Sequence, residues 1–138
     1  MLFYSYIEVV DGESETLVKK GIELFGDFSK EEKAYMAYAN LFSEKAASFI
    51  PEGLEIKSAD YFMGMLTIEV NECIQNYGGS YYEKRFIYQL MKTAESIGAK
   101  SLTVKANGKT VQLPEGSLIF RRKVLELELP EGVNQAAL

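Results

Sequence analysis

Apolar and polar residues alternate most regularly near the C-terminal end of the chain, over residues 101–113. The pair Asn107-Gly108 interrupts this alternation, and an Asn-Gly pair between two alternating runs is the strongest short-range signal for a β-hairpin. A two-residue turn at this pair places Leu102 opposite Leu113, so that one side of the ribbon is apolar. The pattern therefore predicts two paired strands whose apolar side needs a helix to cover it.

The residues that follow predict a last long strand over 118–129. Its apolar positions change parity, because Leu118 and Phe120 are even-numbered whereas Leu125 and Leu127 are odd-numbered. Side chains of a strand alternate between its two faces, so a slip of one residue predicts a bulge or bend within residues 121–124.

The first residues of the chain also alternate and predict a strand over 2–10, which Asp11-Gly12 ends. Apolar residues then recur at three- and four-residue spacing, and this period predicts a helix over 13–25. A second helix has a clearer start signal, because Ser29 and Glu32 have the spacing of a capping box. We expect it to continue over 29–50, up to the first proline of the chain.

A second capping-box pattern, Ser80 and Glu83, predicts the start of a third helix, and Gly98 predicts its end. Its apolar stripe is expected to consist of Phe86, Leu90, Ala94 and Ile97. Between the second and third helices, Leu54 and Ile56 predict a short edge strand. Alternation over 61–74 predicts a longer strand. One face of that strand is expected to carry Phe62, Leu66, Ile68 and Val70.

The predicted order of elements is β-α-α-β-(β)-α-β-β-β. Because strands gather at the end of the chain and do not alternate with helices, this order indicates an α+β protein. We expect a mostly antiparallel sheet of four to six strands with about three helices packed on one face. At 138 residues, the chain is expected to form a single domain over 1–138.

The formal net charge of −5 disfavours binding to nucleic acid or to an anionic membrane, and it is compatible with a basic protein partner. A single cysteine, Cys73, points to a reducing compartment. The first residues lack the basic region and cleavage site of a signal peptide, and no apolar run is long enough to span a bilayer. These features predict a cytoplasmic protein.

The sequence contains no histidine. This absence excludes Ser-His-Asp and Cys-His catalytic systems and the zinc site of the H-E-x-x-H type. One cysteine cannot form a cysteine-rich zinc site either. We therefore expect no metal and no cofactor, and we favour a non-catalytic protein over an enzyme.

A glycine-rich loop precedes the third predicted helix, and free N–H groups at a helix start can bind an anion. The candidate ligand-binding residues are Tyr77, Gly78, Gly79, Ser80 and Arg85. The alternative function for the chain is therefore a phosphate- or nucleotide-binding protein, or an enzyme, that uses this loop. The simpler interpretation is that the two glycines only turn the chain into a helix.

Tyrosine is abundant, with nine residues in the chain, and tyrosine side chains at a surface are effective interface anchors. The candidate anchors lie on or near the predicted helices and are Tyr35, Tyr38, Tyr81, Tyr82 and Tyr88. Half-buried positions at the border of the core are an equally good interpretation. Together these features favour a non-catalytic, acidic module that binds a protein partner. Inhibitors, immunity proteins and phage-encoded proteins directed against a host are modules of this kind, and a homo-oligomer is a further option.

Overall fold

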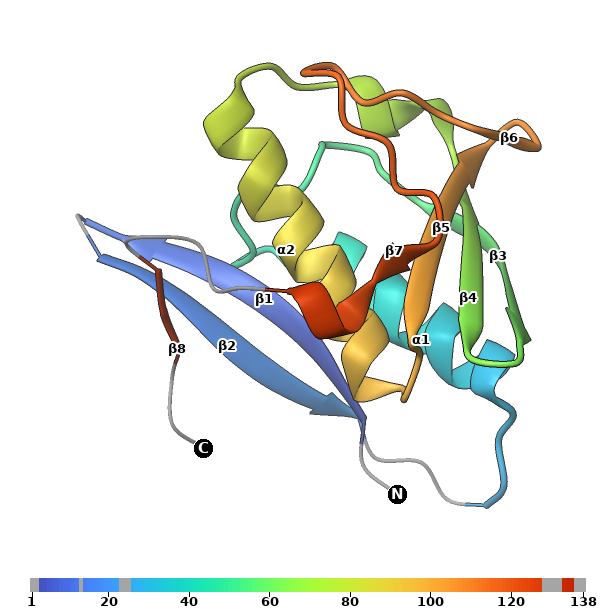
Figure 1. Ribbon diagram of the computed structural model, residues 1–138. Coiled ribbons are helices and arrows are strands. Elements are labelled where there is room, and N and C mark those ends of the chain that lie inside the picture. Colours follow the sequence, from blue (N-terminus) through green and yellow to red (C-terminus); the bar gives the residue numbers. More distant parts are fainter. Residues whose placement is uncertain (1–2, 13, 23–25, 128–132, 136–138) are drawn as a thin grey trace.

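The computed structural model describes residues 3–12, 14–22, 26–127 and 133–135 (Figure 1). They form a mixed α+β domain with two α-helices and two β-sheets. The helices are α1 (Lys30–Ser43) and α2 (Ser80–Ser96), and two short 3-10 segments are η1 (Glu72–Gln75) and η2 (Val124–Glu126). The strands are β1 (Phe3–Asp11), β2 (Ser14–Ile22), β3 (Ile56–Phe62), β4 (Met65–Val70), β5 (Ser101–Ala106), β6 (Lys109–Thr110), β7 (Arg122–Lys123) and β8 (Val133–Gln135).

The larger sheet has the strand order β3-β4-β5-β6, with β7 also pairing with β5, and the smaller sheet has the order β1-β2-β8. The β4–β5 and β2–β8 pairs are parallel and the other pairs are antiparallel. Both helices lie between the two sheets (Figure 1). Helix α1 packs on β3 and β1, whereas α2 runs along β1 and also touches β5. The α+β class is therefore confirmed. The larger sheet has five strands in mostly antiparallel pairs, within the predicted four to six, but the described residues form two α-helices and not three, and they also form a second sheet that was not predicted.

The helix predicted over 13–25 is wrong for the described residues, because Ser14–Ile22 forms strand β2 and pairs with β1 along its whole length; residues 13 and 23–25 lie outside the described residues. Asp11 lies opposite Ser14, so a tight hairpin turn joins the two strands. Gly12, which follows Asp11 with a φ of +63°, supplies a positive φ of the kind that hairpin turns need. Pairing with β1 outweighs the weak helical period, since secondary-structure propensity yields to tertiary contacts.

Helix α1 begins as predicted and ends earlier than predicted. The hydroxyl of Ser29 accepts a hydrogen bond from the Glu32 N–H, and the Glu32 carboxylate accepts one from the Ser29 N–H, which confirms the capping box. The helix ends at Ser43, because Glu44 already has an extended backbone. The following segment crosses the end of β1, where the N–H of Ser48 donates to the carbonyl of Glu8 over 2.7 Å.

The strand predicted over 61–74 is broken by a hairpin turn at Met63-Gly64, where both residues have positive φ. Its residues belong to β3, β4 and η1. The predicted turn at Asn107-Gly108 is confirmed, since Ala106 lies opposite Lys109. However, β6 is only two residues long, and Leu102 lies opposite Arg122 of β7 and not opposite Leu113.

The predicted last strand over 118–129 is also wrong in most of its length, because its described residues form only the short β7, η2 and an isolated bridge at Leu118. Arg121 has a φ of +48°, so a backbone irregularity falls inside the predicted range 121–124. Residues 128–129 lie outside the described residues.

Helix α2 forms the centre of the fold. The predicted apolar stripe is confirmed, since Phe86, Leu90 and Ala94 are fully buried and Ile97 is 1% exposed. Gly98 follows the last residues of the helix with a φ of +90°, as expected for a glycine that ends a helix. The predicted capping box at Ser80 is wrong, because Gly79 is the N-cap and Glu83 binds other groups, described below.

Polar side chains protect the edge of β1 that does not pair with β2. The N–H groups of Tyr4, Tyr6 and Glu8 donate to the side chains of Ser96, Thr93 and Gln89, over 3.1, 3.0 and 2.8 Å. These three acceptors recur at the helical spacing of α2 while their donors recur at the two-residue spacing of a strand. Helix α2 therefore satisfies an edge that would otherwise be open to another strand.

Candidate interaction surface

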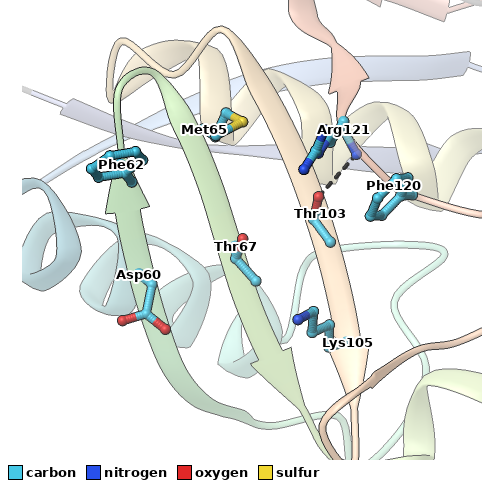
Figure 2. Close-up of a pocket in the computed structure, with 8 residues that line it drawn as sticks. All are labelled: Asp60, Phe62, Met65, Thr67, Thr103, Lys105, Phe120 and Arg121. Carbon is cyan, nitrogen blue, oxygen red and sulfur yellow. Dashed lines mark hydrogen bonds between the residues drawn. The ribbon is translucent and has the colours of Figure 1, made fainter.

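The face of the larger sheet that points away from the helices is not covered by any described element, and it contains a shallow hollow of about 180 Å³ (Figure 2). Three strands and the segment before β7 supply its walls. We call this surface the open sheet face; its lining residues are Asp60, Phe62, Met65, Thr67, Thr103, Lys105, Phe120 and Arg121.

Strand register explains why these side chains gather. Asp60 lies opposite Thr67, and Thr67 lies opposite Thr103, so the three form one row across β3, β4 and β5. Phe62 and Met65 are paired in the next row along the strands. Neighbouring residues of each strand point to the other face and enter the core. They include Leu66, Ile68, Leu102 and Val104, all at most 1% exposed.

Large apolar side chains on this face are in contact with solvent. Phe62 is 67% exposed, Phe120 is 56% exposed and Met65 is 37% exposed, and Met63 at the adjoining turn is 81% exposed. Single exposed apolar residues are ordinary, but a group of them around a hollow is a feature of binding surfaces.

The charges that line the hollow are separated by sign, while Glu69 of β4 lies opposite Lys105 and accepts a hydrogen bond from the Gly108 N–H at the turn after β5. Asp60 lies on β3, whereas Lys105 lies on β5 and Arg121 lies beyond it (Figure 2). The backbone N–H of Arg121 donates to the hydroxyl of Thr103 over 2.9 Å, which fixes Arg121 at the β5 end of the row. The Arg121 guanidinium also lies 5.2 Å from the centre of the Phe120 ring.

The sequence did not identify this surface. In one continuous strand, Phe62 would share a face with Leu66, as predicted. The two-residue turn at Met63-Gly64 pairs Phe62 with Met65, so Phe62 lies on the face opposite to Leu66. A glycine inside an alternating run is a recognised signal for such an interruption, and Gly64 was that signal.

The predicted anion-binding loop is already occupied by carboxylates of the chain. The N–H of Gly79 donates to Glu115 over 2.8 Å. The hydroxyl of Tyr77 donates to Glu83 over 2.8 Å. Gly78 and Ser80 are exposed, whereas Arg85 is buried and points to Glu8 and Glu15. An incoming phosphate would have to displace Glu115, and phosphate binding here stays a prediction.

The five candidate tyrosine anchors lie in different environments. Tyr38 is fully buried and its hydroxyl donates to the carbonyl of Leu90, while Tyr88 is 5% exposed. These two belong to the core and cannot contact a partner. Tyr35 and Tyr81 are exposed and Tyr82 is half-buried, so the anchor prediction stays open for these three.

Two glutamates share one arginine in the interior, where the β1–β2 hairpin meets α2. The Arg85 Nη2 atom lies 3.0 Å from Glu15 Oε2, and the Arg85 Nε atom lies 4.0 Å from Glu8 Oε1. Glu8 is 1% exposed, and burial raises its pKa to about 7, an effect that Arg85 opposes and Glu15 reinforces. Glu8 thus holds a proton in the folded protein over a pH range in which the unfolded chain has lost it.

This raised pKa makes stability depend on pH. Between the ordinary glutamate pKa and about 7, the folded state binds more protons than the unfolded state, so the free energy of unfolding falls as pH rises. We expect the melting temperature to be several degrees lower at pH 8 than at pH 5.5, and we expect Glu8→Gln to remove most of this slope. Thermal unfolding of the unchanged protein and of Glu8→Gln at both pH values measures this difference in melting temperature. An equal difference in the two proteins would contradict the assignment to Glu8.

No group of histidine, cysteine, aspartate and glutamate side chains suited to a metal ion occurs among the described residues. Neither α1 nor α2 combines the length and apolarity that a membrane-crossing helix needs.

No protein-family model matches the chain, and no curated protein matches it. Solved structures do match the chain. The first GerMN domain of the sporulation protein GerM from Bacillus subtilis is 13% identical, with a TM-score of 0.63, and the match covers 89% of this chain and 96% of that one. The tandem GerMN domains of the same protein are 14% identical, with a TM-score of 0.62, and the match covers 88% of this chain and 45% of that one.

A candidate lipoprotein from Clostridium perfringens is 14% identical, with a TM-score of 0.52 over 83% of this chain and 79% of that one. At these identities the similarity concerns the fold alone. The chain described here therefore has a GerMN-like α+β fold.

Proposed function

We propose that this domain is a non-catalytic protein-binding module and that the open sheet face is its binding surface. The observation that supports this proposal is the group of exposed apolar side chains around the hollow, Phe62, Phe120 and Met65. Binding energy at protein interfaces is concentrated in a few large side chains that become buried, and phenyl rings beside an arginine are well suited to this role.

The sheet supports this role because it is a rigid platform. Its other face packs on the helices through fully buried residues such as Leu66 and Ile68, so the side chains of the open sheet face are held in a fixed arrangement. A partner that binds here pays little entropy for ordering the surface. Action as an inhibitor or an immunity protein, and location in the cytoplasm, stay predictions of the sequence. The candidate lipoprotein among the structural neighbours offers a different location for this chain.

Site-specific cross-linking tests the proposal. A photo-activated amino acid at Met63, beside the hollow, is expected to cross-link to protein in the cell of origin. The double variant Phe62→Ser with Phe120→Ser is expected to lower the yield at least tenfold, because it removes both exposed rings. Leu125→Ser is the matched control, since Leu125 is 95% exposed but is not part of the open sheet face.

The control variant is expected to cross-link as the unchanged protein does. Equal losses in the double variant and in Leu125→Ser would refute the open sheet face as the binding surface. If Tyr35→Ser abolished the cross-link and the double variant did not, the surface would lie on α1 instead.

A further inference from the structure

The open sheet face has opposite charges on its two flanks, and this separation restricts its partner. Asp60 stands on the β3 flank, and Lys105 and Arg121 stand on the β5 flank. A uniformly basic partner would meet Lys105 and Arg121, and a uniformly acidic partner would meet Asp60, so either would place like charges together. Nucleic acid would bring phosphates over Asp60 on a chain whose net charge is already −5.

The row through Thr67 and Thr103 has Asp60 at one end and Arg121 at the other, so it is complementary to itself after a two-fold rotation. Resting on the proposed function, we propose that the partner is a second copy of this chain, bound face to face by a two-fold axis parallel to the strands. Rotation about an axis along β4 places β3 of each copy over β5 of the other. The Asp60 carboxylate of each copy then faces the Arg121 guanidinium of the other, because both belong to the row through Thr67 and Thr103.

The charges of this row disfavour the other simple two-fold arrangement. An axis in the plane of the face but perpendicular to the strands would place β3 over β3 and β5 over β5. Asp60 would then lie near its own copy in the partner, and the cations of the β5 flank would meet one another. Like charges placed together in an interface cost free energy. The axis parallel to the strands brings Glu69 of β4 towards its own copy, but the Gly108 N–H holds that carboxylate at the turn after β5, so this axis is favoured.

The apolar side chains fit the same arrangement. Phe62 of each copy is carried over the β5 flank of the other, where Phe120 and Arg121 lie. Two sheets that pack face to face keep their strands within about 30° of each other and interdigitate their side chains. The dimer is thus an aligned sandwich in which the exposed rings of both copies become buried.

The size of the surface sets the strength of association. Three strands at about 4.8 Å spacing and about five residues of 3.3 Å rise give a flat area of roughly 250 Å². The segment before β7 widens this area, but it stays well below the roughly 800 Å² per partner of a standard interface. Association is therefore expected to be weak, with half-association on the order of 100 μM or above.

Sedimentation equilibrium from 10 μM to 1 mM at physiological salt tests the inference. The weight-average mass is expected to rise from that of one chain towards that of two. Asp60→Lys alone and Arg121→Glu alone are each expected to weaken association at least tenfold, because each places like charges in both contacts of the dimer. An equimolar mixture of these two variants is expected to associate like the unchanged protein, since each contact again joins opposite charges.

Recovery in the mixture is the result expected when Asp60 of one copy faces Arg121 of the other. A mixture that stays monomeric, with both variants folded by circular dichroism, would overturn it. Arg121→Asp replaces Arg121→Glu if the latter variant does not fold, since aspartate tolerates the positive φ of this position better. If the unchanged protein is monomeric at 1 mM while the Phe62 and Phe120 substitutions still abolish cross-linking in cells, the self-association is wrong and the proposed function stands. If the Phe62 and Phe120 substitutions change neither the association in solution nor the cross-linking in cells, both the self-association and the proposed function are wrong.

Discussion

Replacing Arg85 with methionine is expected to lower the free energy of unfolding by about 3 kcal/mol, the cost typical of removing one partner from a buried ion pair. Arg85 is 5% exposed and is the cation that faces both Glu8 and Glu15. Without it, the buried Glu8 carboxylate is left close to the partly buried Glu15 carboxylate. Methionine has a similar length and is apolar, so the loss reports the missing charge more than a missing volume.

Glu8 limits this loss, because a carboxyl group whose pKa is already about 7 can take up a proton. The loss is therefore expected to be larger at pH 8 than at pH 6. Adding Glu8→Gln to Arg85→Met is expected to restore part of the stability, which a double-mutant cycle by urea unfolding measures. Lys84→Met is the matched control on the exposed side of the same helix. Equal losses for Lys84→Met and Arg85→Met would show that Arg85 does not stabilise the buried carboxylates.

Replacing Glu83 with alanine is expected to lower the free energy of unfolding by about 2–3 kcal/mol, since hydrogen bonds to a charged group contribute about 1.5–3 kcal/mol. Glu83 is 2% exposed and accepts hydrogen bonds from three residues. They come from the Tyr77 hydroxyl at 2.8 Å, the Glu115 N–H at 2.9 Å and the Ser117 N–H at 3.2 Å. Alanine leaves these donors without their acceptor and detaches the 114–117 turn from α2.

The pKa of Glu83 is shifted in the direction opposite to that of Glu8. Burial alone would raise the pKa of Glu83, but the hydrogen bonds from Glu115, Ser117 and Tyr77 outweigh burial and lower it. Its contribution is thus present above the ordinary glutamate pKa and is lost as pH falls through its lower value in the folded state. Glu83→Gln, which keeps one acceptor oxygen, is expected to be intermediate in stability.

Glu95→Ala is the control for this second prediction, because Glu95 is exposed and pairs with Lys92 on the surface of the same helix. Its loss is expected to stay below about 0.5 kcal/mol, as for most exposed ion pairs. Urea unfolding measures the three variants, and hydrogen exchange at the Ser117 amide reports whether the turn is released. Unchanged exchange in Glu83→Ala would mean that Glu83 does not hold this turn.

Several elements could be read from the sequence because their causes are local. The capping box at Ser29, the Asn107-Gly108 turn and the end of α2 at Gly98 each depend on residues within a few positions of one another. The apolar stripe of α2 is similar, since its spacing of three and four residues fits one helix face and no strand.

Other elements depend on partners far along the chain. Residues 14–22 fit a helix about as well as a strand, and pairing with β1 decides between them. The end of α1 at Ser43 depends on Ser48 binding Glu8. From its position in the chain, Arg85 was predicted to lie at the glycine-rich loop. In the structure it is buried and pairs with Glu8 of β1 and Glu15 of β2.

The sequence by itself determined the α+β class, the start of α1, the apolar stripe of α2 and the Asn107-Gly108 turn, because backbone hydrogen bonds and side-chain periodicity act over a few residues. Only the tertiary structure decided that two sheets enclose the helices and that Phe62, Asp60 and Arg121 share an uncovered face. The reason is physical. Which face of a strand becomes surface depends on the register of its neighbours and on which side the helices pack, and a turn such as Met63-Gly64 can reverse that assignment for every residue on one side of it.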